Sequence, residues 1–211
     1  MLNPAVATKD IVTVVSPMNQ KVSWILASTS SRRKQLLQSI GLEFKRVSAD
    51  INEYKTPPTG QPPIWVAQKN AQLKAQYVAN QYPENYIIGS DTIVVFDQTV
   101  FNKPKNMADA YYMLEQLSNN THQVITAVSV ICKRNNFEKN FTKKTEVSFD
   151  PLTPNFIKHY LAAINPLDKA GAYAIQHPLS QTFAHFNQTG FTNIMGFPIE
   201  AFKKHLQHLL H

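Results

Sequence analysis

The sequence predicts an α/β fold built on a mixed β-sheet. Apolar runs of strand length alternate with segments that carry helical spacing along most of the chain. The alternation lacks the strict strand–helix–strand regularity of a parallel sheet, so an α+β arrangement stays open. With 211 residues, the chain can form one domain with a substantial core, or one domain built as two lobes.

The N-terminal half is predicted to hold two strands and two helices before the central strand. Leu36 and Leu37 share the inner face of the first helix, Ser30 or Ser31 can cap it, and Gly41 can end it. The elements are expected at 23–27 (strand), 31–40 (helix), 44–47 (strand) and, from Pro63 at a first helical position to about Gln81, a second helix.

The rest of the chain begins with a central strand that a polar segment interrupts. Asn106 and the pair Thr153-Pro154 are typical helix starts. The expected elements are strands 86–88 and 93–96 around the polar break 89–92, a helix to 117, strands 124–132 and 144–149 with a turn at 134–136, a helix to 164, short strands 172–175, 182–186 and 192–195, and a last helix after Pro198.

Residues 1–22 are predicted to be a poorly ordered extension before the domain, which would span 23–211. Their apolar patch, Ile11 to Val15, is short and has no basic segment before it, unlike a signal peptide. No apolar run reaches the length needed to span a bilayer, so no membrane association is expected.

Charge and cysteine content restrict the class of protein further. The net charge of +7 favours anionic partners, but the lysines and arginines are scattered, which argues against a nucleic-acid surface and leaves a polyphosphate ligand or a plain solvated surface. Cys132 is the one cysteine, so no intrachain disulfide can form. We expect a small buried side chain at Cys132 and a reducing, cytoplasmic setting.

The strongest local signal is the strand-to-helix turn from Ser28 to Arg33. Ser28 and Ser30 supply hydroxyls, and Arg32 and Arg33 supply planar donors at a helix start whose free N–H groups favour anions. The turn therefore predicts a phosphate-binding site.

Three acidic residues are candidates for chemistry. Asp91 interrupts the central strand directly after Gly89-Ser90, which suits either a displayed base or metal ligand or an ordinary Asx turn. Glu53 and Asp50 are either solvated loop acids or, with Asp91, oxygen ligands for Mg²⁺.

Other polar residues have two interpretations as well. Lys69 and Lys103 are surface lysines or, with the arginines, neutralise a triphosphate. Gln176 either caps a strand or reads the edge of a base. Histidines 205, 208 and 211 share a helical spacing but are expected to be solvated rather than metal-bound.

Seven segments, in order, make the chain resemble the Maf family of nucleoside triphosphate pyrophosphatases. They are Leu26 to Arg33 (LASTSSRR), Gln68 to Ala71 (QKNA), Ile88 to Thr92 (IGSDT), Lys103-Pro104, His122 to Val128 (HQVITAV), Pro166 to Gln176 (PLDKAGAYAIQ) and Ile194 to Pro198 (IMGFP).

The resemblance implies an inosine-triphosphate-pyrophosphatase-like fold of two lobes around a deep cleft, and a possible homodimer. It implies a hydrolase that cleaves a nucleoside triphosphate to the monophosphate and pyrophosphate with a divalent cation, Mg²⁺ or Mn²⁺. Asp91 matches the proton acceptor, and Arg32, Thr92 and Gln176 match the positions of substrate choice. These match the branch that prefers dTTP and UTP. Ser28, Ser30, Arg33, Lys69 and Lys103 would bind phosphate, and Glu53 and Asp91 the metal.

The chain departs from the family pattern at four places. Ser31 replaces a proline, Asn102 replaces the glycine before Lys103-Pro104, 177–180 replaces a glycine-rich turn, and 187–190 replaces an Asp-Gly turn. The last two changes lie beside the edge expected to read the base and bear on substrate choice more than on catalysis. Two alternatives stay open: a pyrophosphatase for 7-methyl-GTP, and a non-catalytic nucleotide sensor that regulates septum formation and cell division.

Overall fold

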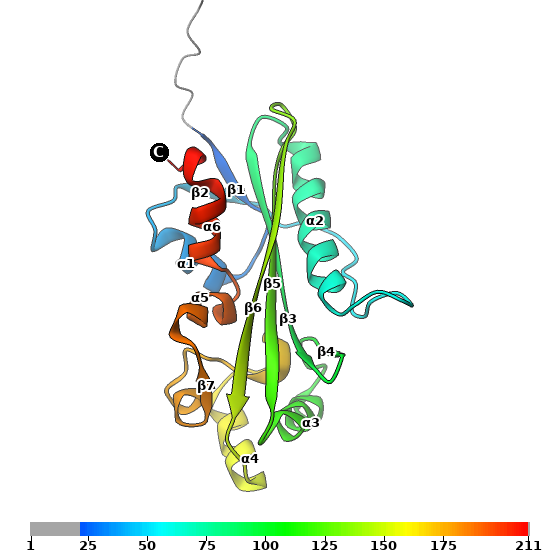
Figure 1. Cartoon of the computed structure of the whole chain (residues 1–211), viewed down its shortest axis with the longest axis vertical. Coiled ribbons are helices and arrows are strands. Elements are labelled where there is room, and N and C mark those ends of the chain that lie inside the picture. The colour runs from blue at the N-terminus through cyan, green and yellow to red at the C-terminus, as the bar shows by residue number, and fades with distance from the viewer. Residues whose placement is uncertain (1–21, 211) are drawn as a thin grey trace, which may run out of the picture.

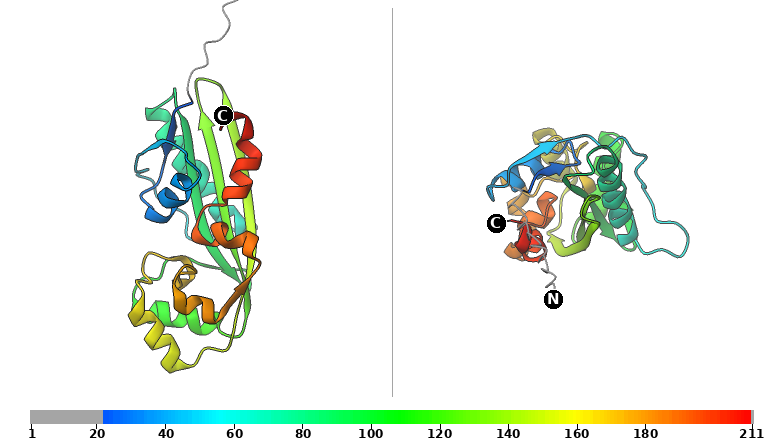
Figure 2. Two further views of the ribbon diagram at one scale, coloured as in Figure 1. Left: turned by 90° about the vertical axis from the view of Figure 1, so that its left-hand side faces the viewer. Right: turned by 90° about the horizontal axis from the view of Figure 1, so that it is seen from above.

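The computed structural model describes residues 22–210 and contains a seven-stranded mixed sheet with helices on both faces (Figures 1 and 2). The strands are β1 (Trp24–Leu26), β2 (Phe44–Arg46), β3 (Tyr86–Phe96), β4 (Thr99–Phe101), β5 (Thr121–Cys132), β6 (Phe137–Phe149) and β7 (Ala184–Phe186). The helices are α1 (Ser31–Gln38), α2 (Ile64–Gln81), α3 (Met107–Leu117), α4 (Pro154–Ala163), α5 (Phe191–Met195) and α6 (Ile199–Leu206).

The sheet has the order β2-β1-β3-β5-β6-β7, with β4 also paired to β3. β1 runs parallel to its two neighbours, while β3, β5, β6 and β7 pair antiparallel. The mixed sheet predicted from the irregular alternation is confirmed.

One edge of β3 has a gap between its partners. β1 pairs with Tyr86 to Ile88, β4 pairs with Val94 to Phe96, and neither strand pairs with 89–93. The other edge pairs with β5 from Ile87 to Val95. The backbone at 89–93 therefore has no strand partner on this edge, and Asp91 and Thr92 of this stretch line the cleft that opens there.

The helices cover the sheet in three groups (Figures 1 and 2). α2 packs on one face through small and branched side chains, and α1 and α6 pack on the opposite face. α3 and α4 form the core of a second lobe at the far end of the long strands. The gap in pairing at 89–93 of β3 lies where these groups of helices meet.

Helix termini follow the caps that the sequence predicted. Ser30 caps α1 by accepting a hydrogen bond from the Arg33 N–H, and Asn106 and Thr153 cap α3 and α4 in the same way. Gly41 has φ +75°, a conformation that glycine adopts without strain, and the chain turns there.

Two predictions of secondary structure were wrong. The polar residues at 89–92 do not interrupt a strand, because β3 runs unbroken and pairing with β5 satisfies its backbone. Of the three short strands expected near the C-terminus, the described chain forms only β7. Ala170–Ala172 and Pro178–Thr182 are 3₁₀ turns and Phe191–Met195 is helical, because local turn bonds replace sheet pairing.

Cys132 is buried, as predicted. The extension predicted for 1–22, and His211, lie outside the described residues apart from Val22. Among the described residues, no helix combines the length and apolar character that crossing a membrane requires.

Buried His122 makes folding sensitive to acid. Burial lowers the pKa of His122 to about 3, whereas an unfolded histidine titrates near 6.5. The contribution of neutral His122 to the free energy of unfolding is therefore fully present above pH 6.5. As the pH falls from 6.5 toward 3, this contribution decreases by up to about 1.4 kcal/mol per pH unit. His122→Gln, which can still bond to the Tyr173 hydroxyl, should show a shallower acid loss in urea unfolding between pH 7 and 4.5. Parallel stability curves would contradict this.

Candidate active site

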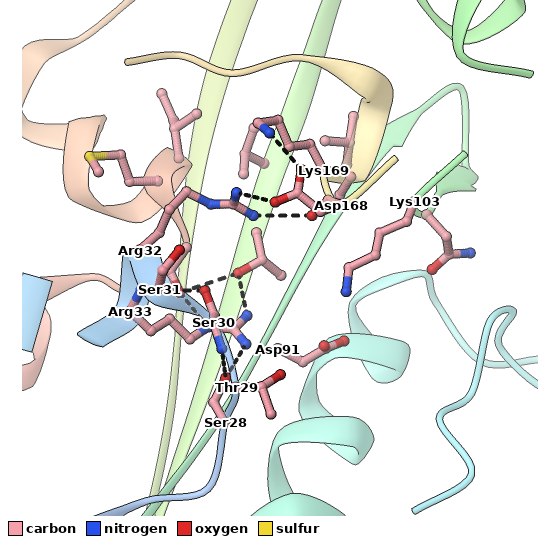
Figure 3. A pocket seen from close by; sticks show the side chains of 18 of the residues that line it. Ser28, Thr29, Ser30, Ser31, Arg32, Arg33, Asp91, Lys103, Asp168 and Lys169 are labelled. Atoms are coloured by element: carbon pink, nitrogen blue, oxygen red, sulfur yellow. Dashed lines mark hydrogen bonds and ion pairs between the residues drawn. The ribbon is translucent and has the colours of Figure 1, made fainter. Parts of the chain in front are cut away.

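The gap in pairing along one edge of β3 opens into a polar cleft with a volume of about 350 Å³. It is lined by the Ser28 to Arg33 turn, by the loop around Glu53, by residues of α2, β3 and the segment after β4, and by 168–176 and 194–196. Figure 3 shows that these side chains converge from several elements.

Arg33 is the most constrained cation of the cleft. Its Nε donates to the Gly196 carbonyl (2.9 Å), its Nη2 to the Thr92 hydroxyl (3.1 Å) and its Nη1 to Ser28 Oγ (3.3 Å). Burial lowers the pKa of Arg33 and the charge of Asp91 opposes this shift, so the guanidinium stays charged. The cleft thus holds a fixed positive charge beside the cap of α1.

Arg32 spans from α1 to the segment after α4. Its guanidinium donates to the Asp168 carboxylate (2.9 Å) and to the Asp168 carbonyl (3.1 Å), as Figure 3 shows. Lys169 also pairs with this carboxylate. Partial burial alone would raise the pKa of Asp168, but the Lys169 and Arg32 contacts outweigh it and hold the pKa below its usual range.

Asp91 is held on both carboxylate oxygens from α2. Lys74 Nζ lies 2.8 Å from Oδ1, and the Asn70 amide donates to Oδ2 at 3.0 Å. Lys74 also lies 2.8 Å from Glu53 Oε1, so one ammonium joins two carboxylates. Asp91 and Lys74 are buried, 8% and 7% exposed.

Glu53 and Lys103 complete this wall. Burial would raise the pKa of Glu53, but the charge and hydrogen bond of Lys74, with Lys55 and Lys103, hold it below its usual range. Lys103 extends from the opposite side toward Asp91 (Figure 3). The carboxylate of Glu53 is therefore ionised at neutral pH and faces a cationic surface.

The placement predicted for Lys69 was wrong. Lys69 lines a separate groove between α2 and β6, with Trp65 and Thr142, and not the cleft. Lys74, which was not predicted as a site residue, lines the cleft in place of Lys69. The signal was available, because Lys74 lies three and seven residues from Ala71 and Ala67 on the buried face of α2, where an unpaired lysine is unfavourable.

Thr92 and Gln176 lie on the walls next to these charges. Thr92 faces away from Asp91, across the sheet, where its hydroxyl contacts Arg33 and Thr126. Gln176 is exposed at the edge of the cleft. Two hydrogen bonds hold Ala174, two residues before Gln176. The Tyr160 hydroxyl accepts from the Ala174 N–H, and Ser180 Oγ donates to the Ala174 carbonyl.

The acidic residues fit a cation only in part. Among the residues the structure describes, no group of three or more His, Cys, Asp or Glu side chains could hold a metal ion, and Asp50, His205 and His208 do not line the cleft. Glu53, Asp91 and Asp168 line it, but Asp168 pairs with Arg32 and Lys169, whereas Glu53 and Asp91 are joined through Lys74. Mg²⁺ commonly binds through one or two carboxylates, with water and substrate phosphates completing its shell, and this pair meets that requirement.

Comparison with known proteins gives the family of the chain. A family model described as Maf-like protein matches residues 23–209. The chain belongs to the Maf family. Membership also confirms the α/β fold class that the sequence predicted.

Two relatives match most of the chain. The dTTP/UTP pyrophosphatase of Cytophaga hutchinsonii is 38% identical over 180 residues, which cover 83% of this chain and 78% of the relative. The dTTP/UTP pyrophosphatase of Geobacillus sp. strain WCH70 is 37% identical over 187 residues, which cover 88% and 97%. A solved structure, a HAM1 protein from Coxiella burnetii, matches 61% of this chain and 73% of its own at 19% identity and TM-score 0.44.

Proposed function

We propose that the chain hydrolyses dTTP and UTP to the nucleoside monophosphate and pyrophosphate. The observation that carries this proposal is Asp91, a buried carboxylate held by Lys74 and Asn70 at a cleft lined by further cations. Its support also includes the relatives named dTTP/UTP pyrophosphatases, 37–38% identical over most of the chain. The buried Cys132 accords with the cytoplasmic setting that we propose for it.

The triphosphate would bind between the α1 turn and Lys103. Arg33 and Lys103 supply positive charges from opposite walls of the cleft. Ser28, Ser30 and the first N–H groups of α1 supply further hydrogen-bond donors. Because Arg33 is already held by three partners, little side-chain conformational freedom is lost when phosphate binds.

Asp91 would orient and deprotonate the attacking water. Each carboxylate oxygen can accept two hydrogen bonds, so the bonds from Lys74 and Asn70 leave acceptor capacity toward the cleft. The water oxygen bonds to the α-phosphorus, the bond from that phosphorus to the bridging oxygen breaks, and pyrophosphate leaves. Asp91 takes the proton of the water.

A divalent cation would be held by Glu53 and Asp91. When bound, Mg²⁺ or Mn²⁺ neutralises phosphate charge and stabilises the leaving pyrophosphate. Lys74 pairs with both carboxylates and directs them to one place, and Lys103 and Arg33 add charge stabilisation from the other walls.

Base selection would come from Arg32, Thr92 and Gln176. Gln176 presents an amide donor and acceptor at the edge of the cleft, which suits a uracil or thymine edge. Thr92 acts through Arg33, and Arg32 through its bond to Asp168.

The test is pyrophosphate release from a panel of dTTP, UTP, CTP, GTP and 7-methyl-GTP with Mn²⁺ or Mg²⁺. We expect dTTP and UTP to give the highest kcat/KM, and Asp91→Asn to lower kcat by about 100- to 10,000-fold. Fastest turnover of 7-methyl-GTP would overturn the base assignment. Nucleotide binding without turnover would favour the non-catalytic sensor.

Tyr160 gives a separate prediction on selectivity. Tyr160→Phe removes the hydroxyl that bonds to Ala174 and Ser180, so the segment ending at Gln176 loosens. We expect the ratio of kcat/KM for UTP to that for CTP to fall about 3- to 10-fold, because a base-reading bond is less well placed. Tyr112→Phe, at an exposed site on α3, is the control. An unchanged ratio would exclude this role.

A further inference from the structure

Glu53 reaches the cleft from a segment with no regular structure. The chain between β2 and α2 forms neither helix nor strand, yet Glu53 lies 2.8 Å from Lys74. The loop from Asp50 to Pro57, here called the Glu53 loop, therefore needs contacts other than sheet or helix bonds to hold this carboxylate in place.

Asn70 supplies the first of these contacts. Its amide oxygen accepts from the Tyr54 N–H at 2.8 Å, and its nitrogen donates to the Tyr54 carbonyl at 3.0 Å. The same nitrogen donates to Asp91 Oδ2 at 3.0 Å, so both its hydrogens are used. Asn70 is 1% exposed and joins the residue next to Glu53 directly to Asp91.

Asn102 supplies a second contact from another element. Its amide donates to the Lys55 carbonyl at 2.7 Å, and its own carbonyl accepts from the Gly171 N–H at 3.2 Å. Asn102 precedes Lys103 in the chain, so the segment that carries this cleft lysine is tied to the Glu53 loop. Two asparagines thus hold the consecutive carbonyls of Tyr54 and Lys55.

A ring contact assists them. Tyr54 and Trp65 meet edge to face with their centroids 4.8 Å apart, which packs the Glu53 loop on the start of α2. This apolar contact holds the loop near α2. The hydrogen bonds of the two asparagine amides fix which residues of the loop lie at the cleft.

We propose that Asn70 and Asn102 are positioning residues that fix the Glu53 loop against Asp91 and Lys103 before substrate binds. Asn70 sets the distance between the two carboxylates, and Asn102 sets the loop relative to the opposite wall. The inference rests on the proposed function for its catalytic consequence, but not for the fastening of the loop.

Amide hydrogen exchange and steady-state kinetics test it with Asn70→Leu and Asn102→Gly. We expect exchange in the Glu53 loop to rise about 10-fold or more in Asn70→Leu, which frees the Tyr54 N–H, and less in Asn102→Gly. kcat should fall about 10- to 100-fold in Asn70→Leu and about 3- to 10-fold in Asn102→Gly. The KM for nucleotide should stay within about 3-fold of wild type, because misplacement of a reacting group acts on the chemical step.

Gln72→Leu is the matched control on α2. Gln72 bonds to Glu138 on the exposed side and touches neither Asp91 nor the Glu53 loop, so loop exchange and kcat should stay at wild-type values. Asn70 is buried, and thermal unfolding checks that its variant folds. Should it not fold, Asn102→Gly decides the proposal, since Asn102 is half-exposed.

The outcomes separate the two levels of the proposal. Unchanged loop exchange in the folded variants would overturn it, as would a loosened loop with wild-type kcat, or a KM change that accounts for the whole loss. A wild-type protein without turnover would overturn the proposed function, and loop exchange would still decide whether the asparagines fasten the loop.

Discussion

Lys74→Met should lower kcat/KM for dTTP and UTP by about 100- to 1,000-fold, the range typical of removing one preorganised electrostatic group. The ammonium lies 2.8 Å from both Asp91 and Glu53, and methionine has a similar length without charge. Without Lys74 the carboxylates of Asp91 and Glu53 repel each other. Asp91 then loses its orientation, and this loss also changes the affinity of the two carboxylates for the divalent cation.

Lys69→Met provides the matched control for this variant. Both lysines lie on α2, but Lys69 lines the groove beside β6 and not the cleft. We expect kcat/KM within about 2-fold of wild type, since a charge outside the cleft is screened by solvent. A loss in Lys69→Met equal to that in Lys74→Met would contradict the placement of the two side chains.

Folding must be measured alongside activity in Lys74→Met. Removing one member of a buried ion pair leaves an uncompensated charge and costs about 3–5 kcal/mol of stability. Urea unfolding measures the free energy of unfolding of the variant, and kinetics are compared at a temperature and pH where this free energy shows it to be folded. Wild-type kcat/KM in a folded variant would exclude Lys74 from catalysis.

Local signals in the sequence were sufficient for α1, α3 and α4, although α5 was predicted as a strand. A cap is a bond between residues three apart, so Ser30, Asn106 and Thr153 could be recognised from their neighbours alone. The Ser28 to Arg33 turn could be recognised as part of a polar site for the same reason, because its residues are contiguous.

Contacts between distant segments could not be predicted in this way. The polar residues 89–92 were interpreted as an interruption of a strand, whereas the interruption is in the partner strands on one edge of β3. Nothing near Asp91 in the chain shows where β1 ends or β4 begins. Lys74 is a different case, since its spacing from Ala67 and Ala71 already places it on the buried face of α2.

The close approach of α2 to β3 depends on Gly89, and Gly89→Ala should destabilise the fold by about 3 kcal/mol, at the upper end of the cost of overpacking. A Cβ at Gly89 would lie 2.2 Å from the Ala71 carbonyl and 2.7 Å from the Ala75 N, and both belong to the backbone of α2. No rotamer change relieves this clash, so α2 must move away from β3.

The same displacement should lower activity, because α2 carries Lys74 and Asn70 while β3 carries Asp91. Gly60→Ala is the control, since an added Cβ there meets nothing within 4 Å and only its φ of +81° opposes the change, at about 1 kcal/mol. We expect kcat to fall at least 10-fold in Gly89→Ala and to stay near wild type in Gly60→Ala, with both variants assayed where they are folded. If Gly89→Ala lost stability but kept kcat, the distance between α2 and β3 would not govern how Asp91 is held.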